Sequence, residues 1–522
     1  MSCAFLSCRN GTWAILCNGV FTEYAAAAVA VEALNADTVV LFDGKKLLRG
    51  NPELSAAAWD RVFDVKLACY VNDPSDDYAN ESAAIKKFFP DTAVENWQEE
   101  CALLLKIYTQ LREKLQDNYI FNHIEQPLSP VLAKMERSGI LLDKAGLEEF
   151  GKALVCQIKD VEKNIFALAG REFNINSPKQ LSTLLFEELA LEPAGKKNRN
   201  GYSTDAEALE KIRDMHPVVP EILLYRKLSK VNSTYVEGVL KYTGSGNRIH
   251  TTFNMTATAT GRLSSTEPNL QNIPVAGDTG GAVRKFFIAE PGWVLIDADY
   301  SQIELRLLAH IANDPVMIDA FCRNEDIHAV TAAQVFGVEL AEVTPEMRRK
   351  AKAVNFGIVY GISAFALAGD LNITQAEARE YIKKYFEKYS AVKSYLESSI
   401  AGAGKNGYAE TLFGRRRALP ELHSKIFAVR SFGERVAMNM PIQGSAADLI
   451  KLAMIKVDSE LAKADLQAKM LLQIHDELLL TAPENEAEKT AQLLKNAMQS
   501  AAELSVPLQV SLAMGRDYSS VK

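Results

Sequence analysis

Two short segments that lie far apart in the chain each place a carboxylate at the end of, or within, an apolar run typical of a β-strand. The first, Val294–Arg306, reads Val-Leu-Ile-Asp-Ala-Asp-Tyr-Ser-Gln-Ile-Glu-Leu-Arg, and the second, Gln473–Glu477, reads Gln-Ile-His-Asp-Glu. A carboxylate in such surroundings is costly unless a cation compensates it. Taken singly, Asp299 and Asp476 are better explained as structural acids that pair with nearby bases. Together they can hold two divalent ions about 4 Å apart, provided that the fold brings them side by side.

A third segment, Arg348–Gly361, supplies positive charge and aromatic rings. Four of its side chains recur at every fourth position: Arg348, Lys352, Phe356 and Tyr360. On a helix each such step drifts by about 40°, so the four share one broad face. Cations on this face can neutralise phosphates, and the rings suit a sugar and a base. A generic basic amphipathic helix is the alternative, but it does not explain Gly357 and Gly361, which lower helix propensity and allow close approach to the backbone.

In this order and wording, the three segments resemble the palm, fingers and palm motifs of DNA polymerase family A, the family of bacterial DNA polymerase I. The resemblance implies an α/β multidomain fold, a right-hand polymerase with palm, fingers and thumb, preceded by a ribonuclease-H-like 3′–5′ exonuclease-type domain. It implies a DNA-directed DNA polymerase, a nucleotidyltransferase that adds deoxynucleotides to a primer 3′ end by two-metal phosphoryl transfer. A single-subunit RNA polymerase-like enzyme and a catalytically inactive primer-template binding subunit are the alternatives.

The resemblance also implies roles for individual residues. Asp299 and Asp476 would hold two Mg²⁺ ions, for which Mn²⁺ can substitute, and Lys352 would protonate the pyrophosphate leaving group. Glu477, next to a metal ligand, would tune the site. The residues implied to bind the dNTP are Glu304, His328, Arg348, Lys352, Phe356 and Tyr360. The residues implied to bind primer-template DNA are Arg262, Asn269, Gln271, Arg435, Asn439, Gln443 and His475.

Two of these positions bear on the choice of sugar. In the family, the glutamate that matches Glu304 closes the space beside the 2′ carbon and excludes ribonucleotides. Ser301 and Glu304 also form Ser-x-x-Glu at a strand-to-helix junction, which predicts a capping box and needs no function. Phe356 stands where the family carries Phe or Tyr, and Phe there implies discrimination against nucleotides that lack the 3′ hydroxyl.

The pattern of apolar residues divides the chain. Alternating strand-like runs (13–16 and 38–42) and a helical stretch (24–34) predict a small α/β unit at the N-terminus. Helices are expected over 128–240, 312–440, 446–461 and 484–503, with a polar loop at 195–201 and strands at 248–253, 293–296 and 508–512. The resemblance assigns 1–118 to a degenerate exonuclease-like domain and 119–522 to the polymerase domain, with the thumb at about 144–245, the palm at about 246–311 and 441–522, and the fingers at about 312–440.

The N-terminal unit is expected to lack proofreading. Its first strand region, residues 3–20, contains no acidic residue, and Glu99–Ala102 lacks the family's Tyr-x-x-x-Asp wording. Only Asp64 matches an expected acidic position, and one carboxylate cannot assemble a two-metal site. Ala276, in the loop 276–281, replaces a basic residue of the family and predicts a weaker grip there. Because no 5′ nuclease segment is seen, the resemblance is to the large fragment of such an enzyme, natural or trimmed.

Charge and cysteine usage bound the remaining possibilities. The 522-residue chain is long enough for three or four compact units, and its net charge is −8. Residues 1–118 hold 11 basic and 17 acidic side chains, so the rest is nearly balanced and can present basic surfaces at the runs 348–350 and 415–417. Seven scattered cysteines, no signal pattern and no long apolar run predict a cytoplasmic protein without a membrane partner. The resemblance implies a bacterial, nucleoid-associated monomer.

Overall fold

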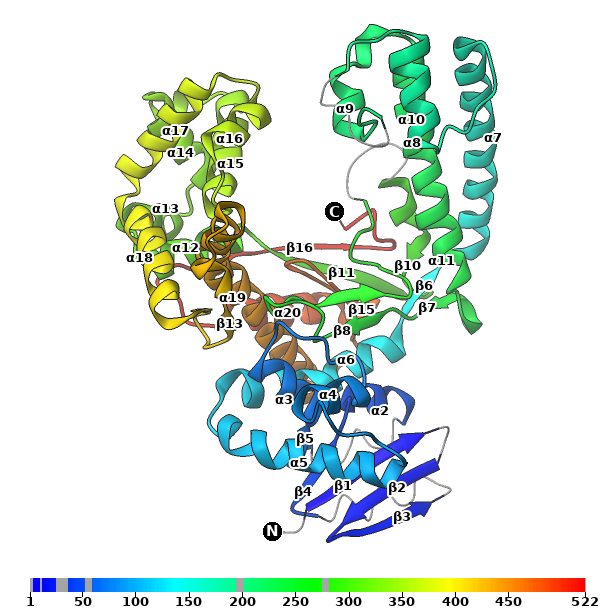
Figure 1. Cartoon of the computed structure of the whole chain (residues 1–522), viewed down its shortest axis with the longest axis vertical. Helices are drawn as coiled ribbons and strands as arrows, with labels where there is room; N and C mark the ends of the chain where they lie inside the picture. The colour runs from blue at the N-terminus through cyan, green and yellow to red at the C-terminus, as the bar shows by residue number, and fades with distance from the viewer. Residues whose placement is uncertain are drawn as a thin grey trace. The chain divides into compact units, whose positions relative to one another are not determined.

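The computed structural model describes residues 3–9, 12–24, 36–51, 59–193, 201–274 and 281–521 (Figure 1). The helix expected over 24–34, the loop at 195–200 and the loop around Ala276 lie outside these residues. The chain forms two compact units, where its length predicted three or four. The first unit comprises 1–138, 252–266 and 296–514, and the second comprises 139–251, 267–295 and 515–522.

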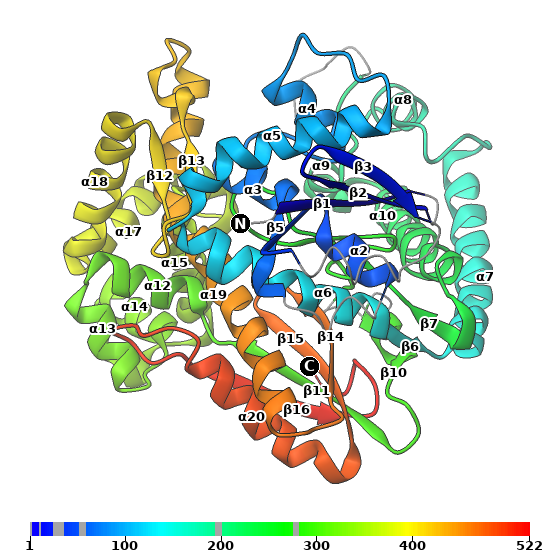
Figure 2. The same ribbon diagram turned by 90° about the horizontal axis from the view of Figure 1, so that it is seen from below.

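The first unit begins with a five-stranded sheet of order β3-β2-β1-β4-β5. Its strands are β1 (Cys3–Arg9), β2 (Thr12–Cys17), β3 (Val20–Tyr24), β4 (Thr38–Leu41) and β5 (Val62–Asp64), with β1 antiparallel to β2 and parallel to β4. Alternate residues such as Leu6 and Leu41 form one core cluster with Leu48 of α2 (Gly44–Gly50) and Ala133 of α6 (Gln126–Ser138). Helix α5 (Trp97–Leu115) packs against β1 and β2 on the other face (Figure 2). Helices α3 (Val65–Asn72) and α4 (Glu81–Phe88) complete this part.

A second sheet of the first unit has the order β14-β15-β11-β16. These strands are β11 (Trp293–Tyr300), β14 (Lys469–Ile474), β15 (Glu477–Pro483) and β16 (Val510–Gly515). Helix α20 (Ala487–Gln499) packs against β15 and against α19 (Phe427–Lys463). A short hairpin of β8 (Thr252–Asn254) and β9 (Ser264–Thr266) lies against α6, which also contacts β5 and β14. Helix α6 thus joins the N-terminal sheet to this part, which explains why the two share one unit.

The helices between β11 and β14 follow the expected pattern with two differences. They are α12 (Ile303–Ala312), α13 (Pro315–Cys322), α14 (Ile327–Phe336), α15 (Pro345–Val359), α16 (Ala364–Leu371), α17 (Gln375–Lys388), α18 (Ser390–Asn406) and α19. The helical prediction for 312–440 missed a hairpin of β12 (Tyr408–Glu410) and β13 (Arg416–Ala418). It also ended the helix near Pro441, whereas α19 continues through that residue. Pro441 is buried between Met440 and Ile442, and this packing outweighs the lost backbone hydrogen bond.

One predicted basic surface is wrong at its first residue. Arg415 is only 3% exposed and pairs with Glu125 and Asp448, which are also buried, while Lys451 pairs with Glu125. Two cations and two carboxylates therefore neutralise one another in the core. Burial alone would raise the pKa of Glu125, but Lys451 and Arg415 hold it below its ordinary value.

The second unit combines a small sheet with helices. Its sheet has the order β10-β6-β7, formed by Phe287–Ile288, Ile140–Leu142 and Arg248–Ile249. The helices are α7 (Lys144–Ala169), α8 (Pro178–Ser182), α9 (Ala206–Lys211), α10 (Val218–Lys230) and α11 (Gly238–Lys241), as expected for 128–240. Helix α7 packs along α10. Among the described helices of the whole chain, none is long and apolar enough to cross a membrane.

Candidate functional site

Asp299 and Asp476 lie on neighbouring segments of the β14-β15-β11-β16 sheet. Asp299 is the penultimate residue of β11, and Asp476 occupies the turn between β14 and β15. The Tyr300 backbone N–H donates to the Asp476 carbonyl at 3.2 Å, so the two segments are joined directly beside the carboxylates. The fold therefore brings together two acids that the sequence separates.

The turn that presents Asp476 has a strained backbone. His475 adopts a φ of 54°, in the left-handed region, which costs a non-glycine residue about 1–2 kcal/mol. The Gln473 side chain donates to the His475 carbonyl at 2.5 Å, and Glu477 pairs with Ile474 to close the hairpin. The His475 side chain is exposed. The hairpin thus holds Asp476 at its tip while leaving His475 accessible to a ligand.

The electrostatics of this site favour a bound cation. Burial and the nearby Glu304 carboxylate raise the pKa of Asp476 to about 6, with Asp299 adding to the rise and Arg262 opposing it. A divalent ion relieves such repulsion between acids. No group of three or more His, Cys, Asp and Glu side chains placed as metal ligands occurs within the described ranges. Two carboxylates still fit Mg²⁺, because this ion commonly takes one or two protein carboxylates and completes its shell with water and substrate phosphates.

Glu304 is not part of a capping box. Helix α12 begins at Ile303, and its N-cap is Gln302 in the left-handed conformation, without a side-chain capping bond. Ser301 therefore lies one residue too early to cap, and the predicted Ser301–Glu304 box is wrong. Both Glu304 oxygens accept hydrogen bonds from other residues. Arg262 Nη2 donates to Oε1 at 2.7 Å, and the Tyr360 hydroxyl donates to Oε2 at 2.9 Å.

Helix α15 presents the predicted basic and aromatic side chains in one row. Arg348 donates from Nε to Asp326 Oδ2 at 2.5 Å. Lys352 is exposed and has no ion-pair partner in the described part of the chain, and its Nζ lies 5.9 Å from the Phe356 ring centroid. The helix ends one residue before Tyr360, whose N–H still donates to the Phe356 carbonyl at 3.1 Å. A cationic end and an aromatic end thus lie along one helix.

His328 is buried beside this row and is held in one protonation state. Asn355 Nδ2 lies 2.9 Å from His328 Nδ1, and the Thr331 hydroxyl donates to Asn355 Oδ1 at 3.1 Å. Because the Asn355 oxygen already accepts a hydrogen bond, its nitrogen donates to Nδ1, and the histidine proton resides on Nε2. Burial lowers the pKa of His328 to about 4, with Asp326 opposing this and Arg348 and Lys352 adding to it. At neutral pH the ring is therefore an uncharged donor.

The face of α19 that carries the predicted DNA-binding residues lies against the end of α15. Arg435 is exposed, and Gln443 forms a side-chain hydrogen bond with Tyr360. The buried Oδ1 of Asn439 has no hydrogen-bond partner among the described residues. Gly361 has a φ of 67°, a left-handed backbone that favours glycine, and it lies close to the Met438 and Arg435 side chains of α19. An orphaned acceptor beside an exposed arginine is consistent with a site for a polar ligand.

Two other predicted residues belong to the second unit. They are Asn269 and Gln271, and the Gln271 N–H donates to Asn269 Oδ1 at 3.0 Å. Asn269 is exposed. The first unit brings together all the other predicted site residues, namely Arg262, Asp299, Glu304, His328, Arg348, Lys352, Phe356, Tyr360, Arg435, Asn439, Gln443, His475 and Asp476.

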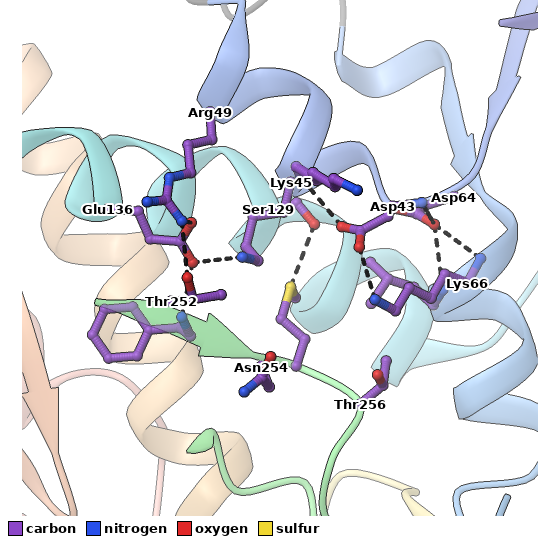
Figure 3. Close-up of a pocket in the computed structure, with 14 residues that line it drawn as sticks. Asp43, Lys45, Arg49, Asp64, Lys66, Ser129, Glu136, Thr252, Asn254 and Thr256 are labelled. Atoms are coloured by element: carbon purple, nitrogen blue, oxygen red, sulfur yellow. Dashed lines mark hydrogen bonds and ion pairs between the residues drawn. The ribbon is translucent and has the colours of Figure 1, made fainter. Parts of the chain in front are cut away.

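Asp64 lies in a separate cavity of about 210 Å³ between α2, α3, α6 and β8 (Figure 3). It is the last residue of β5 and the N-cap of α3. Its carboxylate accepts four backbone N–H groups, those of Asp43, Gly44, Lys66 and Leu67, at 2.6–3.4 Å. Three of these bonds go to Oδ1 and one to Oδ2, so the carboxylate serves as a structural cap and offers a metal ion little besides Oδ2.

The other charges of this cavity are also paired. Lys66 bonds Asp43 at 2.7 Å, and Glu136 accepts from both Lys45 and Arg49 (Figure 3). Asp43 adds to the burial that raises the pKa of Asp64 to about 6. Within the described ranges these acids nevertheless form no group of three or more side chains placed as metal ligands.

Sequence reasoning missed three residues that organise the side chains predicted to bind dNTP. Asp326 caps α14 and pairs with Arg348, and Asn355 and Thr331 orient His328. The signal for Asp326 was present, because an aspartate directly before an apolar helical run is a typical N-cap. Asn355 and Thr331 lie on different helices, and their spacing in the sequence gives no sign of their contact.

Comparisons with known proteins agree with this geometry. The family model described as DNA polymerase family A matches residues 144–520. The DNA polymerase I of Caldicellulosiruptor bescii is 46% identical over 502 residues, which cover 94% of this chain and 59% of that protein. The DNA polymerase I of Bacillus caldotenax is 47% identical over 488 residues, covering 88% of this chain and 55% of that protein. The chain thus spans less than two thirds of the length of these relatives.

A solved structure extends the similarity to almost the whole chain. It is described as the POL domain of Pol1 from M. smegmatis in complex with DNA primer-template and dNTP. The two chains are 35% identical with a TM-score of 0.91, over 99% of this chain and 95% of that one.

Proposed function

This chain belongs to DNA polymerase family A, and on that premise we propose that it is a DNA-directed DNA polymerase that extends a primer 3′ end with deoxynucleotides. The observation that carries the proposal is the direct joining of the Asp299 and Asp476 segments, through the 3.2 Å bond from the Tyr300 N–H to the Asp476 carbonyl. Its partners are primer-template DNA and dNTPs, and it acts as a monomer on nucleoid DNA. The complex of the mycobacterial POL domain with primer-template and dNTP supports this choice of partners.

The carboxylates of Asp299 and Asp476 hold two Mg²⁺ ions, which Mn²⁺ can replace. When bound, these ions stabilise the charge of the attacking and leaving oxygens. Burial, together with repulsion from Glu304 and Asp299, raises the pKa of Asp476 to about 6, and a bound cation would offset both effects, which supports this role. Glu477, buried at the start of β15, fixes the strand beside Asp476 and so tunes the site.

The row of side chains on α15 binds the triphosphate. Arg348 and Lys352 neutralise its charge, and the neutral His328 donates from Nε2 to a phosphate oxygen. Lys352 gives a proton to the pyrophosphate as it leaves. The exposure of Lys352 and the absence of an ion-pair partner for it among the described residues leave it free to meet a polyanion.

The sugar, base and DNA contacts follow from the neighbouring residues. Glu304 closes the space beside the 2′ carbon, and Phe356 and Tyr360 pack against the sugar and base. Arg262 contacts the minor groove at the primer terminus, where hydrogen-bond acceptors are shared by all base pairs. The residues that complete the contacts to the primer-template are Asn269, Gln271, Arg435, Asn439, Gln443 and His475.

The N-terminal part, residues 1–118, is a degenerate 3′–5′ exonuclease-like domain that does not proofread. The strand order of its sheet supports the assignment to an exonuclease-like fold. The four N–H bonds to Asp64 support the loss of nuclease activity. Residues 119–522 form the polymerase domain, with the thumb at about 144–245, the palm at about 246–311 and 441–522, and the fingers at about 312–440. With this division the boundary between fingers and palm falls inside α19, which runs without a break from Phe427 to Lys463.

A primer-extension assay with Mg²⁺ tests the proposal. The protein should extend a labelled primer on a DNA template with dNTPs and use NTPs poorly. Efficient use of NTPs would favour an RNA polymerase-like enzyme, and failure to extend with either set, although primer-template binds, would indicate an inactive binding subunit.

A further inference from the structure

The loop that carries Arg262 is anchored at its base by α2 of the N-terminal part and by α6. This loop, residues 255–263, joins β8 to β9. The Phe253 N–H of β8 donates to Glu136 of α6 at 2.8 Å, and Arg49 of α2 donates to the Thr252 hydroxyl at 2.9 Å. Figure 3 shows Arg49, Glu136 and Thr252 meeting on one side of the cavity. The strand that leads into the loop is therefore fixed partly from outside the polymerase domain, by Arg49 of the N-terminal part.

The middle of the loop is held by a single buried tyrosine of α3. The Tyr70 hydroxyl donates to the Thr258 carbonyl at 2.7 Å, and Tyr70 is fully buried. Thr258 in turn donates from its hydroxyl to the Arg262 carbonyl at 2.8 Å. Two hydrogen bonds thus connect an N-terminal helix to the backbone of the residue that faces the primer terminus.

The far side of the loop rests on the buried charges. Gly261 has a φ of 87°, and a Cβ there would lie 2.5 Å from Arg415 Nε. Arg415 is held by Glu125 and Asp448, and its guanidinium lies 5.7 Å from the Tyr70 ring centroid. The loop is therefore clamped between a tyrosine and an arginine, neither of which faces a substrate.

The contacts continue outward to the nucleotide-facing side chains. Arg262 donates to Glu304 at 2.7 Å, and Glu304 accepts from Tyr360 at 2.9 Å. A shift of the loop would move Arg262, and with it the carboxylate that borders the sugar. Active-site geometry of this kind is sensitive to displacements of about 1 Å.

We propose that Tyr70 of the N-terminal part is a positioning residue of the polymerase site, which fixes the 255–263 loop and thereby sets the place of Arg262 and Glu304. The proposal rests on the polymerase function proposed above. It gives the domain without nuclease activity a part in nucleotide incorporation, because its helix α3 supplies a hydrogen bond that the polymerase core does not itself provide.

The test compares Tyr70→Phe with Tyr78→Phe. Tyr78 is a second buried tyrosine of the N-terminal part, so its variant controls for the general loss of a buried hydroxyl. In single-nucleotide incorporation, Tyr70→Phe should lower kcat by roughly three- to tenfold, the effect of one lost hydrogen bond, with little change in the KM for dNTP. Tyr78→Phe should match the parent. In an Arg262→Ala background, Tyr70→Phe should have no further effect, because its action passes through Arg262.

A second readout does not depend on catalysis. Hydrogen exchange of the amides of residues 256–263 should be faster in Tyr70→Phe than in the parent, and unchanged in Tyr78→Phe. Should Tyr70→Phe fail to fold, Arg49→Gln loosens the base of the same loop and should show the same two effects.

The outcomes separate the two proposals. A parent that does not extend primers would refute the polymerase function, while faster loop exchange in Tyr70→Phe would still support positioning. An active parent with equal kcat and equal loop exchange in Tyr70→Phe would overturn the positioning role alone. If Tyr70→Phe still lowers kcat in the Arg262→Ala background, the positioning role is also overturned, because Tyr70 would then act by a route that does not involve Arg262.

Discussion

The Tyr360 hydroxyl donates a hydrogen bond of 2.9 Å to Glu304 Oε2, which ties the end of α15 to the first turn of α12. Burial and the neighbouring Glu304 carboxylate raise the pKa of Tyr360 to about 12, so the phenol remains a donor at neutral pH. The other Glu304 oxygen accepts from Arg262. Since both oxygens are engaged, Glu304 can act as a fixed steric wall beside an incoming sugar.

This arrangement predicts the effect of Glu304→Ala. Removing the wall should raise the use of ribonucleotides relative to deoxynucleotides by roughly tenfold or more, because filling or emptying a small space changes discrimination on that scale. The measurement is the ratio of kcat/KM for the two sugars in single-nucleotide incorporation. Glu380→Ala, which removes an exposed carboxylate of α17, is the matched control, and an unchanged ratio in Glu304→Ala would leave Glu304 without a role in sugar choice.

Phe356→Tyr should raise the acceptance of dideoxynucleotides. Phe356 is half-buried beside Lys352 and His328, and a phenol hydroxyl there can replace the hydrogen-bonding partner that a nucleotide without a 3′ hydroxyl lacks. Competition between ddNTP and dNTP in sequencing-type extension reactions measures this ratio. A Tyr variant as selective as the parent would contradict the role given to Phe356.

Asp299→Asn and Asp476→Asn should each reduce synthesis to a few per cent of the parent rate or less, since one carboxylate cannot hold both ions. Affinity for primer-template should change little, because it comes mainly from phosphate contacts spread over many basic residues. Extension rates and DNA affinity are measured side by side, with Asp370→Asn, an exposed position in α16, as the control. Substantial extension by either site variant would exclude the two-metal assignment.

The protein should not shorten a 3′-mismatched, end-labelled primer in Mg²⁺ without nucleotides. Asp64 is the N-cap of α3, so Asp64→Ala should lower the free energy of unfolding by about 0.5–2 kcal/mol. Asp64→Asn retains a hydrogen-bond acceptor and should lower the free energy of unfolding by less. If the parent degrades the primer and Asp64→Ala does not, the N-terminal domain is an active nuclease and the interpretation of Asp64 as a structural cap is wrong.

His328 should make stability depend on pH. Its pKa in the folded protein is about 4, below the ordinary value of 6.5, because it is buried. As the pH falls, the unfolded chain therefore binds a proton at this histidine before the folded protein does. The contribution of the uncharged His328 to the free energy of unfolding is complete above pH 6.5 and is lost between pH 6.5 and 4. At pH 5 the loss should be about 2 kcal/mol. Urea unfolding at pH 7 and pH 5 measures it, and His328→Gln should lose less stability than the parent over this interval.

The joining of Asp299 to Asp476 could be predicted because the segments around both acids resemble the palm motifs of the family, whereas each acid alone could have been a structural carboxylate paired with a base. The face of α15 followed equally from helical spacing. The capping box at Ser301 could not be judged in this way, since the start of α12 depends on a left-handed backbone at Gln302. The spacing of Ser-x-x-Glu is the same whether or not that backbone forms.

Contacts between segments that lie far apart in the chain could not be predicted from the sequence either. Arg415 begins a run of three arginines, a pattern typical of a surface, yet its partners Glu125 and Asp448 place it in the core. The sequence showed no sign of a function for Tyr70, because its hydroxyl donates to the backbone carbonyl of Thr258. Every residue has such a carbonyl, so the residue type of the acceptor does not indicate the contact.

The buried group of Glu125, Arg415, Asp448 and Lys451 has an evolutionary consequence. Replacing any one of these four residues leaves an unbalanced charge in the core. The loss of stability is typically about 3–5 kcal/mol. Replacing all four by apolar side chains would avoid that cost but would remove the guanidinium against which Gly261 packs. Substitutions at these positions are therefore expected to arise together across related sequences, so that a lineage crosses from one viable set to another only through paired or compensated changes.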